Sequence, residues 1–137
     1  RDLPMSSNSL ISVIDDDESV RESLEGLLKS ADFRVKTFPG AQEFLSSGHI
    51  ERTDCLILDV RLEGMSGPEL QRVLIASNQP VPIVFITGHA DEGMRGRFLA
   101  AGAVDCLLKP FTEDALLAAV DSALRLAGRP GSKGPEF

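Results

Sequence analysis

LISVIDDD (residues 10–17) is the stretch that decides the fold, because a run with four apolar residues out of five ends in three consecutive aspartates. A short apolar run bounded in this way is typical of a buried strand. CLILD (residues 55–59) repeats the pattern and also ends on an aspartate. If both runs are parallel strands, their acids emerge at one edge of the sheet, where doubly wound α/β folds hold their functional sites.

Apolar runs of this kind alternate with helical patterns along most of the chain. Strands are expected near residues 10–15, 33–38, 54–59, 83–87 and 104–108. Helices are expected near residues 18–31, 40–47, 67–77, 91–101 and 112–127. Such alternation is typical of a parallel sheet that helices cover on both faces. We therefore predict an α/β fold, a doubly wound (βα)5 flavodoxin-like sandwich. The parallel sheet order 2-1-3-4-5, one of the two common doubly wound arrangements, is the one that we expect, because it places the ends of the first and third strands side by side.

Two of the expected helices have features that set them apart. In the helix over 18–31 the apolar spacing places Arg21 on the solvent side. The helix over 91–101 contains Gly93 and Gly96, and each glycine in a helix interior costs about 1 kcal/mol relative to alanine. We expect the helix over 91–101 to be the most mobile of the five.

Composition limits the classes of function. The 137 residues suffice for one domain with a hydrophobic core. The net charge of −7 argues against nucleic-acid binding by this domain, since such binding depends on clustered lysine and arginine. Neither a membrane-spanning stretch nor a signal peptide is visible, so we expect no membrane partner and a cytoplasmic location.

Both ends of the chain look like additions to the domain. Residues 1–9 carry a proline and a polar Ser-Ser-Asn-Ser run, and we expect an N-terminal tail there, part of it vector-derived. Residues 128–137 hold three glycines and two prolines without periodicity, as in a linker stub or a vector-derived tail. The domain itself is expected over residues 10–127.

Polar side chains of different chemistry follow the expected strands. Asp15 and Asp16 follow the first strand, Asp59 ends the third, Thr87 ends the fourth and Lys109 follows the fifth. Carboxylates packed together raise one another's pKa unless a cation neutralises them. An all-oxygen cluster suits a hard divalent ion such as Mg²⁺. Together with an ammonium and a hydroxyl, the cluster could hold the oxygens of a phosphoryl group, with a carboxylate as nucleophile.

With these motifs the chain resembles the receiver domain of two-component response regulators over residues 10–127. The matching motifs are Asp15-Asp16, Asp59 followed by Met65-Ser66-Gly67, Thr87-Gly88, and Lys109-Pro110-Phe111. The stretches 85–91 and 102–105 look most like receivers that precede a LuxR-like helix-turn-helix DNA-binding domain.

The resemblance implies a phosphorylation switch. Asp59 would accept a phosphoryl group from a sensor histidine kinase, and Mg²⁺, or Mn²⁺ or another divalent cation in its place, would be bound by Asp16, Asp59 and the Arg61 backbone carbonyl. Asp15 would act through a metal-bound water.

Other residues would respond to the phosphoryl group. By resemblance, Thr87 would engage a phosphoryl oxygen and Lys109 would pair with it, while Gly88, His89 and Arg61 would lie beside it and modulate its lifetime. The switched surface would comprise the segments 91–101, 104–108 and 112–127, and it could mediate phosphorylation-dependent homodimerisation and control of the output domain in transcription.

Cys106 departs from the family pattern. Receivers usually carry tyrosine or phenylalanine at this position, and that ring moves inward when the threonine engages the phosphate. Cys106 cannot supply the same volume, so rotation of a ring at this position cannot be the readout here.

Two other classes compete with the receiver hypothesis. A flavodoxin-like cofactor binder needs a hydroxyl- and glycine-rich phosphate loop after the first strand, where this chain has acids. A Mg²⁺-dependent phosphohydrolase would use Asp15 as nucleophile and Asp17 as acid/base, and the two have the required spacing. Labelling with acetyl phosphate separates the three: Asp59 for a receiver, Asp15 for a hydrolase, and neither for a flavin binder.

Overall fold

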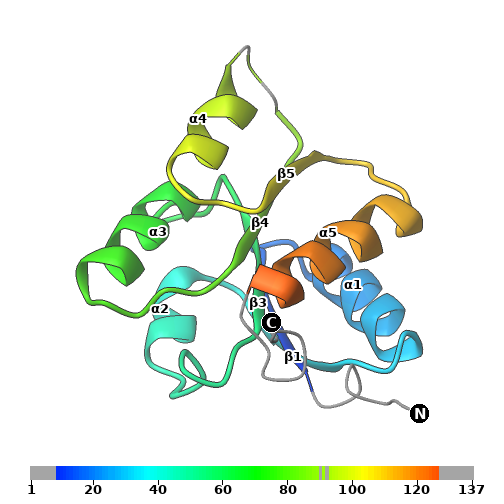
Figure 1. Ribbon diagram of the computed structural model, residues 1–137. Coiled ribbons are helices and arrows are strands. Elements are labelled where there is room, and N and C mark those ends of the chain that lie inside the picture. Colours follow the sequence, from blue (N-terminus) through cyan, green and yellow to red (C-terminus); the bar gives the residue numbers. More distant parts are fainter. Residues whose placement is uncertain (1–8, 90, 92, 127–137) are drawn as a thin grey trace, which may run out of the picture.

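Strands and helices alternate strictly along the chain in the computed structural model, which describes residues 9–89, 91 and 93–126 (Figure 1). The strands are β1 (Leu10–Ile14), β2 (Arg34–Phe38), β3 (Cys55–Asp59), β4 (Ile83–Thr87) and β5 (Asp105–Leu108). The helices are α1 (Glu18–Ser30), α2 (Ala41–Leu45), α3 (Gly67–Ala76), α4 (Met94–Ala100) and α5 (Glu113–Leu126). All strand pairs are parallel and the sheet order is β2-β1-β3-β4-β5, so the predicted fold is confirmed.

Each face of the sheet carries its own hydrophobic core. Helices α1 and α5 cover one face, and α2, α3 and α4 cover the other (Figure 1). Along β3 the side chains alternate between them: Cys55 and Ile57 join the core under α1 and α5, while Leu56 and Leu58 join the core under α3. Because strands of this kind are buried on both faces, they read as continuous apolar runs in the sequence.

Two helices are shorter than expected, each for a local reason. The backbone of Gly93 is left-handed, with φ of 85°, so Gly93 is the N-cap of α4 and not part of its interior, and α4 begins only at Met94. Helix α2 ends at Leu45 because the Ser46 and Ser47 hydroxyls donate to the preceding carbonyls. Residue 127, the expected end of α5, lies outside the described residues.

Strand register brings the ends of β1 and β3 together. Ile14 pairs with Leu58, so Asp15 and Asp59 emerge side by side at the carboxyl edge. On the far side of β4, the Lys109 amide donates to the Thr87 carbonyl at 2.7 Å. The sheet order β2-β1-β3-β4-β5 thus gathers residues from four strands at one edge. None of the helices in the described residues has the length and hydrophobicity needed to cross a bilayer.

Candidate functional site

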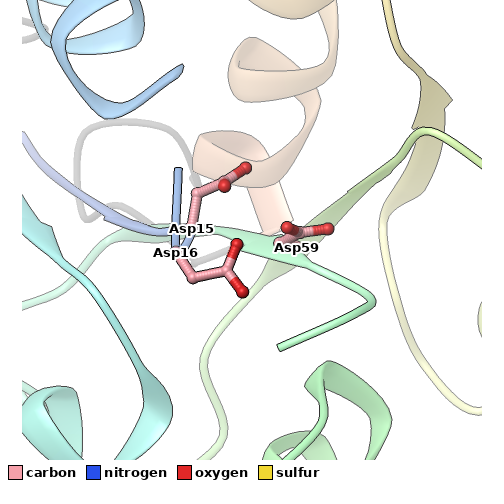
Figure 2. Close-up of side chains that lie close together, drawn as sticks. All are labelled: Asp15, Asp16 and Asp59. Carbon is pink, nitrogen blue, oxygen red and sulfur yellow. The ribbon is translucent and has the colours of Figure 1, made fainter. Parts of the chain in front are cut away.

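Three carboxylates form an acidic cluster at the carboxyl edge of the sheet (Figure 2). Asp15, Asp16 and Asp59 each offer an oxygen atom within 4.8 Å of the others. Asp15 is fully buried and Asp59 is 6% exposed, whereas Asp16 faces solvent. The sequence predicted this meeting of β1 and β3 acids, and the geometry brings them together.

Hydrogen bonds hold Asp15 at its backbone amide and at both carboxylate oxygens. Its amide donates to the Phe38 carbonyl at 3.2 Å, and its Oδ1 accepts the Asp17 amide at 2.9 Å. Its Oδ2 accepts the Lys109 ammonium at 2.8 Å. Both carboxylate oxygens of Asp15 are therefore engaged by the protein. Asp17 itself is the N-cap of α1 and accepts the Ser19 amide at 2.9 Å.

Asp59 has fewer partners and a perturbed acidity. The Arg61 amide donates to its Oδ1 at 3.3 Å, and the Lys109 ammonium lies 3.5 Å from its Oδ2. Burial, and next the charge of Asp15, raise the pKa of Asp59 to about 6 against the opposing effect of Lys109. A carboxylate that is costly to ionise alone is one that a bound cation would stabilise.

Lys109 bridges two members of the acidic cluster from the end of β5. Burial lowers the pKa of Lys109, but the hydrogen bond to Asp15 and the charge of Asp59 outweigh that effect, so the pKa lies above its ordinary value. The ammonium is therefore a fixed positive charge. One ammonium against three carboxylates leaves the cluster with a net negative charge, and its donor set is entirely oxygen, so the residues present fit a hard divalent cation.

The other predicted site residues are not members of the acidic cluster. Thr87 is buried, and its hydroxyl forms hydrogen bonds to the His89 backbone, donating to the carbonyl at 3.0 Å and accepting from the amide at 3.1 Å. Gly88 and His89 are exposed directly after β4, and Arg61 is exposed two residues after Asp59. In this structure the Thr87 hydroxyl is therefore committed to its own loop.

Cys106 lies within β5, three residues before Lys109. It is half-buried, it packs against the core that α4 covers, and burial raises the pKa of its thiol. Its neighbour across the sheet is Phe85, whose ring centroid is 4.6 Å from that of Phe98 in α4. An aromatic pair thus occupies the core beside Cys106.

Sequence reasoning missed the contacts of four residues that shape the site. Arg21, expected on the solvent side, is half-buried and donates from Nη1 to the Asp15 carbonyl at 2.8 Å. Ser66 and Glu69 form a reciprocal capping box at the start of α3, and the Ser-x-x-Glu spacing could have revealed it. Gly67 packs so closely on the end of β3 that an added Cβ would lie 2.5 Å from the Asp59 carbonyl oxygen.

Comparison with known proteins agrees with this geometry. Residues 11–121 match the family model of the response regulator receiver domain. The response regulator protein TmoT of Ectopseudomonas mendocina is 42% identical over 129 residues, 94% of this chain and 59% of TmoT. The transcriptional regulatory protein FixJ of Bradyrhizobium diazoefficiens is also 42% identical over 129 residues, 94% of this chain and 62% of FixJ.

A solved structure gives the same result in three dimensions. The structure of the response regulator StyR superposes with a TM-score of 0.81 at 49% sequence identity, over 88% of this chain and 61% of StyR. The chain thus spans about three fifths of the length of each of these proteins.

Proposed function

The chain belongs to the family of response regulator receiver domains, and we propose that it is the phosphoacceptor module of a two-component transcription regulator. Its relatives are signalling proteins. The proposed activity is confined to the domain itself: Asp59 takes a phosphoryl group from the phosphohistidine of a sensor kinase and later loses it to water. The observation that carries the proposal is the position of the Asp59 carboxylate, within 4.8 Å of two other acids and 3.5 Å from the half-buried ammonium of Lys109.

A divalent cation completes the proposed site. Asp16, Asp59 and the backbone carbonyl of Arg61 would hold Mg²⁺, and Asp15 would contribute through a bound water because its own oxygens are engaged. Mn²⁺ or another divalent cation could take the same place. When bound, the cation offsets the charge that gathers on the phosphoryl oxygens during transfer.

The proposed transfer is a single displacement at phosphorus. A carboxylate oxygen of Asp59 forms a bond to phosphorus while the P–N bond of phosphohistidine breaks, and the electron pair leaves with the imidazole nitrogen. Lys109, already 3.5 Å from Asp59, pairs with the transferred phosphoryl oxygens. Thr87 donates its hydroxyl to one of them after giving up the His89 carbonyl as acceptor.

The phosphohydrolase alternative is not favoured. It requires Asp15 as the nucleophile, yet both Asp15 oxygens accept hydrogen bonds and the side chain is inaccessible to solvent. Asp17, its proposed acid/base, is occupied as the helix cap. The family match points in the same direction.

Arg61 and His89 are proposed to set the lifetime of the phosphoryl group. Both side chains are exposed two residues after the ends of β3 and β4, from where we expect them to obstruct or guide an attacking water, and Gly88 leaves that approach open. Arg61→Ala and His89→Ala are expected to change the autodephosphorylation rate severalfold, a barrier change of about 1 kcal/mol, with little effect on unfolding. Phosphate release from labelled protein measures the rate, and parental rates in both variants would contradict the assignment.

The proposed partners are a sensor histidine kinase and a DNA-binding output domain in the longer protein. Phosphorylation is proposed to change the surface formed by α4, β5 and α5 and to allow homodimerisation there. The dimer would in turn control the output domain. The proposed location of the protein is the cytoplasm, where the DNA lies. The relatives TmoT and FixJ, named as a response regulator and a transcriptional regulatory protein, support this assignment.

Acetyl phosphate labelling tests the proposal. With Mg²⁺ present, mass spectrometry is expected to locate one phosphoryl group on Asp59, and Asp16→Asn is expected to abolish the label. Asp17→Asn is the matched control, since it changes the next acid along but asparagine still caps α1. A label on Asp15, or undiminished labelling of the Asp16→Asn variant, would overturn the proposal.

A further inference from the structure

Arg21 makes a contact that the proposed phosphotransfer does not use. It lies in the first turns of α1, where its amide donates to the Asp17 carbonyl at 3.0 Å. Its side chain turns back toward the sheet, and Nη1 donates to the Asp15 carbonyl at 2.8 Å. The arginine is half-buried, so this bond is partly shielded from water.

We propose that Arg21 is a positioning residue for the cation site, which aims the Asp16 carboxylate by fixing the peptide that joins Asp15 to Asp16. The inference rests on the proposed function and adds to it a residue outside the acidic cluster. Arg21 touches neither the phosphoryl group nor the cation. It acts through the backbone.

The rigidity of the peptide bond carries the argument. The Asp15 carbonyl and the Asp16 amide belong to one planar unit, so a bond that fixes the carbonyl also fixes the direction in which the Asp16 backbone begins. Asp15 is already held through its amide and both carboxylate oxygens. Arg21 adds the remaining backbone anchor, on the side from which the chain leaves for Asp16.

Asp16 needs such an anchor more than its neighbours do. Asp15 and Asp59 are buried and packed among other groups, whereas Asp16 is exposed on the loop between β1 and α1. The orientation of its carboxylate therefore depends on the backbone that carries it. Bonds from a charged donor are stronger than those between neutral groups, which suits a guanidinium to this task. Removing groups that orient metal ligands commonly weakens metal binding without removing a ligand.

Mg²⁺ binding by calorimetry tests the inference on the whole chain. Arg21→Met keeps the apolar stem but has no donor, and it is expected to raise the Mg²⁺ dissociation constant about tenfold, the lower end of what such a loss costs. Arg21→Lys keeps one charged donor and is expected to stay within about twofold of the parent. Lys29→Met removes a cation from the other end of the same helix, where its ammonium pairs with Glu25, and should leave the constant unchanged.

The outcomes separate this inference from the proposed function. If the parent itself binds no Mg²⁺, the proposed function fails. If the parent binds and Arg21→Met binds equally well or more tightly, the positioning role is overturned, because Arg21 is then a structural contact or a competing charge. Unfolding in chelator reports any purely structural loss. Should Arg21→Met not fold, Arg21→Gln against Arg21→Lys carries the comparison, and equal constants for those two variants would overturn the inference.

Discussion

The carboxylate of Asp59 is costly to ionise in the metal-free protein. It is buried at the end of β3 beside Asp15, and the single ammonium of Lys109 is closer to Asp15 than to Asp59. Its pKa of about 6 lies above the ordinary value of 3.8, so the folded protein holds this proton more tightly than the unfolded chain does. Ionised Asp59 therefore destabilises the metal-free fold. The penalty is absent below about pH 4, grows between about pH 4 and 6, and is complete above that.

Asp59→Asn should remove this penalty. In chelator, the variant is expected to be more stable than the parent near neutral pH by on the order of 1 kcal/mol, and the difference should shrink toward about pH 4. Urea unfolding at a series of pH values measures it. With Mg²⁺ added, the gain should diminish or reverse, because the variant lacks a proposed ligand. A difference that does not vary with pH would show that ionisation of Asp59 is not its source.

The junction between β3 and α3 sets the position of Asp59 at the scale of elements. Helix α3 begins at Gly67, under a capping box formed by Ser66 and Glu69, and the Gly67 amide donates to the Val60 carbonyl at 3.0 Å. The hydrogen bond from the Ser66 amide lowers the pKa of Glu69, so the cap holds an ionised carboxylate. A Cβ at Gly67 would collide with the Asp59 carbonyl and crowd the Phe85 ring. The absence of a side chain is what lets the helix approach the strand.

Gly67→Ala is expected to destabilise the fold by about 1 to 3 kcal/mol and to slow Asp59 labelling, because the strand end must move. Gly26→Ala is the matched control: it lies inside α1 with nothing within 4 Å of the added carbon, and it should stabilise by about 0.5 to 1 kcal/mol. Urea unfolding gives both values. The same change in the free energy of unfolding at both sites would contradict this account of the junction. Unchanged labelling of Gly67→Ala would contradict it as well.

Helix α4 is less stabilised by its own structure than α1, α3 and α5. It has seven residues, it lacks a side-chain cap because Gly93 stands at the N-cap, and its anchors to the core are chiefly Met94 and Phe98. We expect its amides to exchange with deuterium faster than those of α1, α3 and α5, and Asp59 phosphorylation to increase their protection. Gly96→Ala, with open space around the added carbon, should slow the exchange. Exchange as slow as that of α5 would refute the expectation.

The limits of sequence reasoning follow from the same elements. The strands were predictable, since buried parallel strands leave continuous apolar runs. In the order 2-1-3-4-5, one of the two common doubly wound arrangements, the acids after β1 and β3 then had to meet. The start of α4 was not, because a glycine in an expected helix gives no sign of whether its φ is negative or positive. Side-chain direction was also hidden: helical periodicity placed Arg21 in solvent, but a long side chain can turn back to a carbonyl six residues earlier. The hydroxyl of Thr87 likewise bonds to its own loop.

At the scale of the whole molecule, the two edges of the sheet differ. The β2 edge exposes Arg34 and Lys36, and charged side chains on an edge strand discourage pairing with another chain. The β5 edge ends in Leu108, which is 52% exposed, and begins at Asp105, which forms an ion pair with Arg95 of α4 at 2.9 Å. An exposed leucine on the same edge strand as an ion pair fits an interface with a small apolar centre and a polar rim.

Leu108→Glu should therefore block the proposed phosphorylation-dependent dimer. The phosphorylated parent is expected to sediment as a dimer and the unphosphorylated protein as a monomer, whereas phosphorylated Leu108→Glu should stay monomeric, because the dimer would bury a carboxylate without a partner. Ile75→Glu is the matched control, since Ile75 is 58% exposed but lies on α3, away from β5. It should dimerise as the parent does. Sedimentation of acetyl phosphate-treated protein measures the oligomeric state of all three proteins. A phosphorylated parent that remains monomeric would contradict the proposed dimer. A dimer lost in Ile75→Glu and kept in Leu108→Glu would place the dimer interface on another face.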